Sequence, residues 1–216
     1  MDSPTLRDAV ATEFATTGAA TPPWPDPHLG REGPRNEEYS RCLDPGKYRI
    51  VGARAEAWVT ALAGLGLAVV EEVSDVTGAW RGRCGLDMNR ATWLRPVRAG
   101  CLPMLVGFHH LQGVPDAVVH LGAGQPAVPL LSVPDCGCDA CDDGSDLILE
   151  ELDKHVVSVV SGAFVHVTTR HGPIAATGPE WSASGLFPRG FDFDALLTET
   201  RAGRSRHPVV RGGPWG

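Results

Sequence analysis

Short apolar stretches separated by glycine and proline fill the middle of the chain and constrain its fold most strongly. Residues 91–98, 104–111 and 117–121 have the length and composition of strands, and residues 127–133 are a fourth candidate. The residues that separate them are Gly100, Pro103, Gly113, Pro115 and Gly122. This spacing is typical of hairpin turns and predicts an antiparallel sheet of consecutive strands.

Helical periodicity flanks these strands on both sides. Residues 48–65 and 144–161 carry apolar side chains at three- and four-residue steps, and glycine follows each stretch. Further strands are predicted at residues 67–73 and 163–169. The order α-β-β-β-β-(β)-α-β predicts an α+β fold, with a mainly antiparallel sheet and two principal helices on one face.

Composition divides the chain into three parts. Residues 1–36 include a proline-dense run at 21–27 that cannot join a helix or a central strand, so we predict a flexible N-terminal arm. Trp24 in that run either docks on the domain or is exposed. Residues 37–172 form the predicted α+β domain. Residues 173–216 are predicted to be an irregular, partly ordered tail with a short helix at 193–201.

Three cysteines lie within six residues, just before the second predicted helix. Zinc takes four tetrahedral ligands, usually cysteine and histidine, and the two-residue gap between Cys138 and Cys141 lets both sulfurs face one ion. Cys136 supplies a third thiolate. Aspartates surround the cluster, and their charge would repel thiolates unless a cation were bound. We therefore predict a metal site at Cys136, Cys138 and Cys141, with zinc favoured and iron not excluded.

The fourth ligand is left open by the sequence. The candidates are Cys101, His109, His110, His120 and water. An open fourth position would be catalytic and a closed one structural. Strand alternation places His109 and His110 on opposite faces, and a structural role is the simpler interpretation of each histidine. Cys42 and Cys84 lie in separate loops and are predicted to be incidental.

Two other interpretations of the cysteines remain open. Cys138 and Cys141 form a Cys-x-x-Cys dithiol, and a thiol near a helix N-terminus can have a lowered pKa, but the thioredoxin-like βαβ context is missing. The cysteines could instead be small residues that brace a tight turn. A cleft over the cysteine loop that also held His109 or His120 would favour an enzyme.

Charge and hydropathy exclude several classes of function. The chain has 19 basic and 26 acidic residues, a net charge of -7, which disfavours nucleic-acid and anionic-membrane binding. No stretch approaches the roughly 18 apolar residues of a membrane span, and residues 1–11 do not resemble a signal peptide. We expect a cytoplasmic protein, whose thiols stay mostly reduced. No phosphate-binding loop or serine-nucleophile motif is present.

The run from Val133 to Asp142 contains Cys-Gly-Cys-Asp-Ala-Cys-Asp after a proline, and an acidic amphipathic helix and Gly162-Ala163-Phe164 follow it. This pattern resembles an actinobacterial family, the domain of unknown function 6226 family, in which a second glycine stands where this chain has Ala163. The resemblance extends upstream to about Tyr39. It implies that the three cysteines matter without deciding their role, and it implies an actinobacterial origin, in keeping with the excess of arginine over lysine.

These patterns predict a small cytoplasmic protein that binds zinc through Cys136, Cys138 and Cys141. We expect it to act as an accessory or partner-binding protein, whose partner is a protein or a small molecule and neither nucleic acid nor membrane. The alternative is an enzyme that uses an open cysteine/histidine metal site, or the Cys-x-x-Cys dithiol, for redox chemistry. The sequence leaves the oligomeric state open.

Overall fold

The computed structural model describes residues 3–30, 33–81 and 87–216. Its largest element is a five-stranded sheet in which every strand is antiparallel to its neighbours, in the order β1-β2-β3-β4-β5. The strands are β1 (Ala68–Glu72), β2 (Arg90–Pro96), β3 (Met104–Leu111), β4 (Val114–Ala123) and β5 (Val128–Val133). The consecutive hairpins predicted from the glycine and proline spacing are therefore confirmed.

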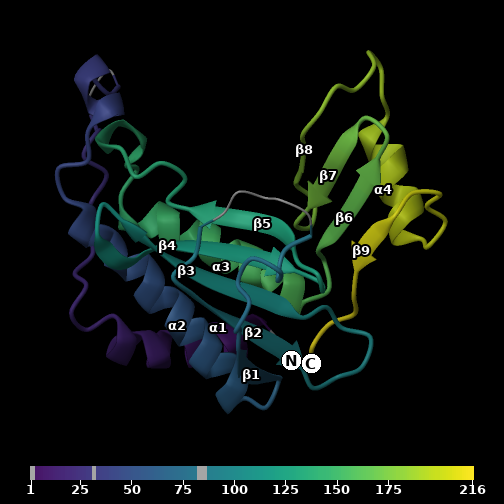
Figure 1. Cartoon of the computed structure of the whole chain (residues 1–216), viewed down its shortest axis with the longest axis horizontal. Coiled ribbons are helices and arrows are strands. Elements are labelled where there is room, and N and C mark those ends of the chain that lie inside the picture. The colour runs from purple at the N-terminus through teal and green to yellow at the C-terminus, as the bar shows by residue number, and fades with distance from the viewer. Residues whose placement is uncertain (1–2, 31–32, 82–86) are drawn as a thin grey trace.

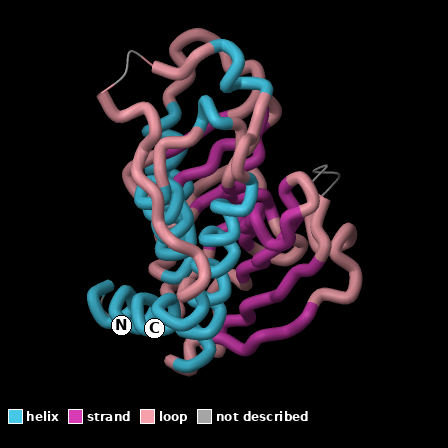
Figure 2. The backbone as a smooth tube through the Cα atoms, turned by 90° about the vertical axis from the view of Figure 1, so that its left-hand side faces the viewer, coloured by secondary structure: helices cyan, strands magenta, loops and turns pink. Residues whose placement is uncertain are grey.

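Helices α2 (Arg49–Gly64) and α3 (Ser145–Val160) cover one face of this sheet, as Figure 2 shows from the side. Alternate side chains of β3 and β4 point into that layer, among them Phe108 and Leu121, and they pack with Trp58 of α2 in one buried core. Asp153 of α3 accepts hydrogen bonds from Trp58 Nε1 at 2.6 Å and Arg54 Nε at 3.0 Å, which ties the two helices together. The predicted α+β class is confirmed.

Residues 73–81, which follow β1, pack against the opposite face of the sheet. Trp80 lies over Gly122, where even a Cβ atom would come within 2.6 Å of the indole ring. Trp80, Trp93 and Leu105 form a second, smaller buried cluster on this side. The sheet is therefore buried on both faces over much of its area.

The N-terminal region differs from the flexible arm that the proline content predicted. Residues Ser3–Thr17 form helix α1, which packs along α2. Leu6, Val10 and Phe14 recur every fourth residue and supply the packing stripe, with the first two buried. The proline-dense run after α1 has no helix or strand, as predicted, but it also lies against the domain through Trp24.

The C-terminal region is also more regular than predicted. A second antiparallel sheet has the order β8-β7-β6-β9, and α4 (Phe193–Arg201) packs on it at the helix position predicted from the sequence. The strands of this second sheet are β6 (Val165–Thr169), β7 (Gly172–Ala176), β8 (Trp181–Ala183) and β9 (Val209–Arg211). Trp215 then returns to the main core, where its backbone N–H donates to Val160 O at 2.9 Å.

Residues 134–144 connect β5 to α3 and carry the three clustered cysteines. Three short 3-10 helices lie in or near this region: η1 (Asn36–Ser40), η2 (Pro45–Tyr48) and η3 (Asp139–Cys141). Figure 1 shows this end of the molecule at the left, far from the second sheet at the right. Among the described helices, none combines the length and the apolar composition that a bilayer crossing needs.

Candidate metal site

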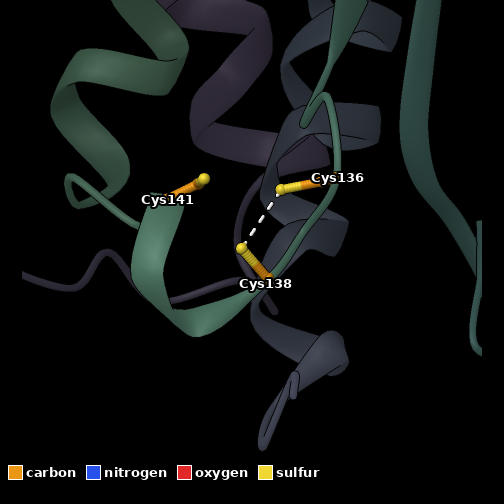
Figure 3. Close-up of side chains that lie close together, drawn as sticks. All are labelled: Cys136, Cys138 and Cys141. Carbon is orange, nitrogen blue, oxygen red and sulfur yellow. Dashed lines mark hydrogen bonds between the residues drawn. The ribbon is translucent and has the colours of Figure 1, made fainter. Parts of the chain in front are cut away.

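The three predicted ligands lie together. The Sγ atoms of Cys136, Cys138 and Cys141 are all within 4.8 Å of one another, and Cys136 and Cys138 are 3.2 Å apart. Figure 3 shows the three side chains pointing into one space, Cys141 from η3 and the other two from the preceding turn. Cys136 and Cys141 are exposed and Cys138 is half-buried, so an ion could reach the sulfurs from solvent.

Two glycines shape the turn that gathers the sulfurs. Gly137 has φ of +66°, and a Cβ atom there would lie 2.8 Å from the side chain of Leu111 at the end of β3. This backbone conformation favours glycine. Gly144 has φ of +86°, and the backbone of Asp26 approaches it so closely that a Cβ atom would be 2.6 Å from Asp26 N.

Asp142 anchors the loop to two other parts of the chain. Its carboxylate accepts hydrogen bonds from Trp24 Nε1 at 2.8 Å and from the backbone N–H of Gly144 at 3.0 Å. The same carboxylate forms an ion pair with Lys47 of η2. Asp142 is buried, so these partners compensate for the loss of its hydration. Trp24 therefore docks on the domain, which settles the choice that the sequence left open.

Asp139 anchors the loop to the segment before η2. Its backbone N–H donates to Arg41 O at 2.9 Å, and its carboxylate accepts from Leu43 N at 3.0 Å and Arg41 Nε at 2.8 Å. Cys42 lies between these two bonded residues. Asp139 itself stands between Cys138 and Cys141, so residues nearly a hundred positions apart in the sequence are held side by side.

Neighbouring thiols shift the pKa values of Cys138 and Cys141. Burial raises the pKa of Cys138, but the hydrogen bonds with the Cys136 and Cys141 thiols and with backbone N–H groups lower it by more, so the net pKa is lowered. The same contacts with Cys138 and Cys136 raise the pKa of Cys141 to about 12. Of these two thiols, Cys138 is therefore the first to lose its proton as the pH rises, while Cys141 keeps its proton at neutral pH.

Tyr48 lies beneath the loop. Burial raises the pKa of its hydroxyl, and the negative charges of Asp142, Cys42 and Cys136 raise it further. Burial also raises the pKa of Cys42, followed by the charge of Asp139. The charges of Cys42 and Cys136 therefore both raise the pKa of the same phenol.

The sulfur geometry suits zinc. A tetrahedral ion with Zn–S bonds of about 2.3 Å holds its sulfurs about 3.8 Å apart. The observed spacing, from 3.2 Å to at most 4.8 Å, brackets that value, so small rotations of the side chains would bring all three sulfurs into place. Thiolates are soft ligands, so three of them would also suit iron.

The other predicted ligands lie elsewhere. Cys101 precedes β3, whose eight residues span roughly 25 Å, and Leu111 at the far end of that strand contacts the cysteine loop. The Cys101 thiol donates to Pro214 O instead. Among the described residues, the group of cysteines, histidines and carboxylates with metal-site spacing is Cys136, Cys138 and Cys141. Cys84 lies outside the described residues.

The histidines form a separate group on the sheet. His109 and His120 lie on the face away from α2 and α3, with ring centroids 6.3 Å apart. A register shift after His109 breaks the strand alternation, and the rings of His109 and His110 stack at 6.4 Å rather than diverging to opposite faces as predicted. Burial lowers the pKa of His120, and His109 lowers it further.

A cavity of about 550 Å³ adjoins the cysteine loop, and Cys141 lines its wall. Most of its charged lining residues are acidic: Asp135, Asp142, Asp143, Glu150, Glu151 and Glu180. Lys154 is the basic residue of the lining and pairs with Glu180. No histidine appears among the described residues that line it, so the cleft that would have favoured an enzyme, with His109 or His120 beside the cysteines, is not found there.

Comparison with known proteins agrees with the resemblance inferred from residues 133–164. No curated protein and no solved structure matches the chain. The model of the family described as "Family of unknown function (DUF6226)" matches residues 10–216, which includes the helix–sheet core, the cysteine loop and the second sheet. The chain therefore belongs to the family of unknown function DUF6226.

Proposed function

We propose that this protein binds one zinc ion through Cys136, Cys138 and Cys141. The observation that carries the proposal is the convergence of three sulfurs within 4.8 Å, in a turn that a left-handed glycine makes possible. A cytoplasmic location, where thiols stay reduced, would keep these sulfurs available as ligands. Zinc would also neutralise the negative charge that three thiolates bring beside Asp139 and Asp142.

The ion would have a structural effect. The loop joins β5 to α3 and is bonded to the Trp24 segment through Asp142 and to the Arg41 segment through Asp139. A metal that cross-links the loop would hold these contacts together, and its binding free energy would add to the stability of this end of the molecule.

Exposed apolar side chains around the loop support a role as an accessory or partner-binding protein. Leu29, Tyr39, Leu43 and Leu147 are between 56% and 82% exposed. Each belongs to a segment that contacts the loop or adjoins it: Leu43 N donates to Asp139, and Leu147 lines the cavity beside Cys141. Large apolar side chains that stay exposed are candidates for a contact with another protein. The zinc site would present this surface in a fixed shape.

The second candidate function is an enzyme in which the metal keeps an open position. The observation in its favour is that Cys141 lines the acidic cavity, so a ligand in the cavity would approach the ion. A cationic small molecule would suit the charge of the cavity. The number of protein ligands separates the two candidates, because a fourth protein ligand closes the site.

Zinc titration of the apoprotein against a competing chelator tests the proposal. Wild type and Cys101→Ser should each bind one zinc per chain with the same affinity, because Cys101 is a half-buried thiol away from the loop. Cys138→Ser should lose binding. Equal zinc affinity in Cys138→Ser and wild type would refute the site.

Replacing Leu43 by aspartate tests the partner surface separately. Leu43→Asp should keep its zinc and lose a partner that wild type retains in a pull-down from its native host. A partner retained equally by wild type, Leu43→Asp and the zinc-free Cys138→Ser variant would refute the role of this surface.

A further inference from the structure

Cys42 is a fourth thiol at the edge of the cysteine loop. Its neighbours Arg41 and Leu43 are both bonded to Asp139, at 2.9 Å through Arg41 O and at 3.0 Å through Leu43 N. Asp139 lies between Cys138 and Cys141 in the sequence. The backbone at Cys42 is therefore fixed beside the Cys-x-x-Cys turn by bonds on either side of it.

A second contact places the segment before Cys42 against the loop. Helix η1, just before Cys42, packs against η3, which ends in Cys141. The Cys42 segment thus meets the cysteine loop through hydrogen bonds to Asp139 and through packing of two short helices.

Three other potential ligands near the triad are already engaged. Asp142 is paired with Lys47, and Asp139 with Arg41. His28 bonds Asp142 O through Nδ1 at 3.1 Å and faces Glu38 through Nε2 at 3.6 Å. Cys42 has a half-exposed thiol on a short connection between two 3-10 helices, so turning this side chain would break none of the backbone bonds that hold the segment.

We propose that Cys42 is the fourth ligand, so that the ion is held by Cys42, Cys136, Cys138 and Cys141 in a closed, structural site. The inference rests on the proposed zinc function and deepens it. The Cys42 sulfur is not among those within 4.8 Å of one another. Binding therefore requires its side chain to turn toward the triad, and the ion links the segment before α2 to the segment before α3.

This assignment decides between the two candidate functions. Zinc with four cysteine ligands has no open position for a substrate, and such sites stabilise folds. The cavity beside Cys141 would then not give access to the metal. A site closed by Cys42 therefore favours the accessory or partner-binding role over metal-dependent catalysis.

Cobalt(II) substitution tests the fourth ligand, because charge-transfer absorption grows with the number of bound thiolates. Wild type and Cys101→Ser should give the same spectrum, that of a tetrahedral site with four thiolates. In Cys42→Ser this absorption should fall by about one quarter, since one of four ligands is lost. Zinc affinity of that variant should fall by more than the roughly 10- to 100-fold typical of an outer-shell partner.

Alkylation of the unmutated protein provides a second readout that does not depend on whether a variant folds. In the zinc-bound chain, peptide mapping should find Cys42 protected together with the triad. A chelator should expose all four thiols, while labelling of Cys101 stays unchanged.

The outcomes separate the two proposals. Metal binding by wild type, with an unchanged cobalt spectrum in Cys42→Ser and rapid labelling of Cys42 in the zinc-bound chain, would overturn the fourth ligand and leave the three-cysteine site standing. Failure of wild type to bind cobalt or zinc would overturn both.

Discussion

The helix–sheet core and the cysteine loop are stabilised in different ways. In the core, Trp58, Phe108 and Leu121 are at most 1% exposed, and the burial of apolar surface supplies the stabilising free energy. The loop is held mainly by a few polar contacts to Asp139 and Asp142, and two of its three sulfurs are exposed. A metal cross-link would therefore add little to the stability of the core but would stabilise the loop.

The largest expected effect is in the core and does not depend on metal. Phe108→Ala removes a fully buried ring and should destabilise the fold by about 3–5 kcal/mol. Urea unfolding of wild type and variant, each with zinc and with a chelator, measures this. The loss should be the same in both conditions. If the loss of unfolding free energy differed by more than about 1 kcal/mol between zinc and chelator, the core and the loop would be energetically coupled.

Zinc should stabilise the chain only through the loop. At a free zinc concentration a thousand times the Kd, wild type should gain about 4 kcal/mol of unfolding free energy. Cys138→Ser should gain nothing, and Cys101→Ser should match wild type. The same urea experiment over a series of buffered zinc concentrations measures the gain. A zinc-dependent gain in Cys138→Ser would contradict the assignment of the ligands.

Removal of the buried carboxylate in the loop should have the next largest effect. Asp142→Ala leaves Lys47 and the Trp24 indole N–H without their acceptor, and it should cost about 3 kcal/mol. The matched control is Asp143→Ala, an exposed neighbour, which should change stability by less than about 0.5 kcal/mol. Thermal unfolding with a chelator compares them. Equal effects would mean that Asp142 does not anchor the loop.

The smallest expected effect is the change in zinc affinity for each unit of pH. The pKa of Cys141 is raised to about 12, so this thiol is protonated at neutral pH and must release its proton when it ligates zinc. Zinc affinity should therefore rise with pH, at least about tenfold per unit between pH 6 and 8, which is about 1.4 kcal/mol. Chelator-competition titrations at several pH values measure this slope. An affinity that did not change with pH would argue against thiolate ligation.

Local patterns in the sequence predicted the central part of the fold. The predicted strand at 104–111 and the predicted helix at 193–201 have the bounds of β3 and α4, because side-chain periodicity and flanking breakers define such elements without help from distant residues. The triad was found for the same reason, since its ligands lie within six residues.

Most of the second sheet was not predicted. The strand predicted at 163–169 corresponds to β6, but β7, β8 and β9 have only three to five residues, and β9 pairs with β6 across some forty positions, so local sequence carries little signal for them. Helix α1 was overlooked because its apolar stripe is narrow, although the four-residue spacing of Leu6, Val10 and Phe14 was visible. The nearness of Cys42 to the loop depends on the Arg41–Asp139 contacts, which no spacing rule reveals.

Elemental analysis of freshly purified wild-type protein from a zinc-replete host, with thiol titration before and after a chelator, is the most direct test of the cysteine metal site. We predict about one zinc per chain, with the thiols of Cys136, Cys138 and Cys141 reacting only after the metal is removed. Protein that carries no metal, and whose three thiols react freely from the start, would contradict it.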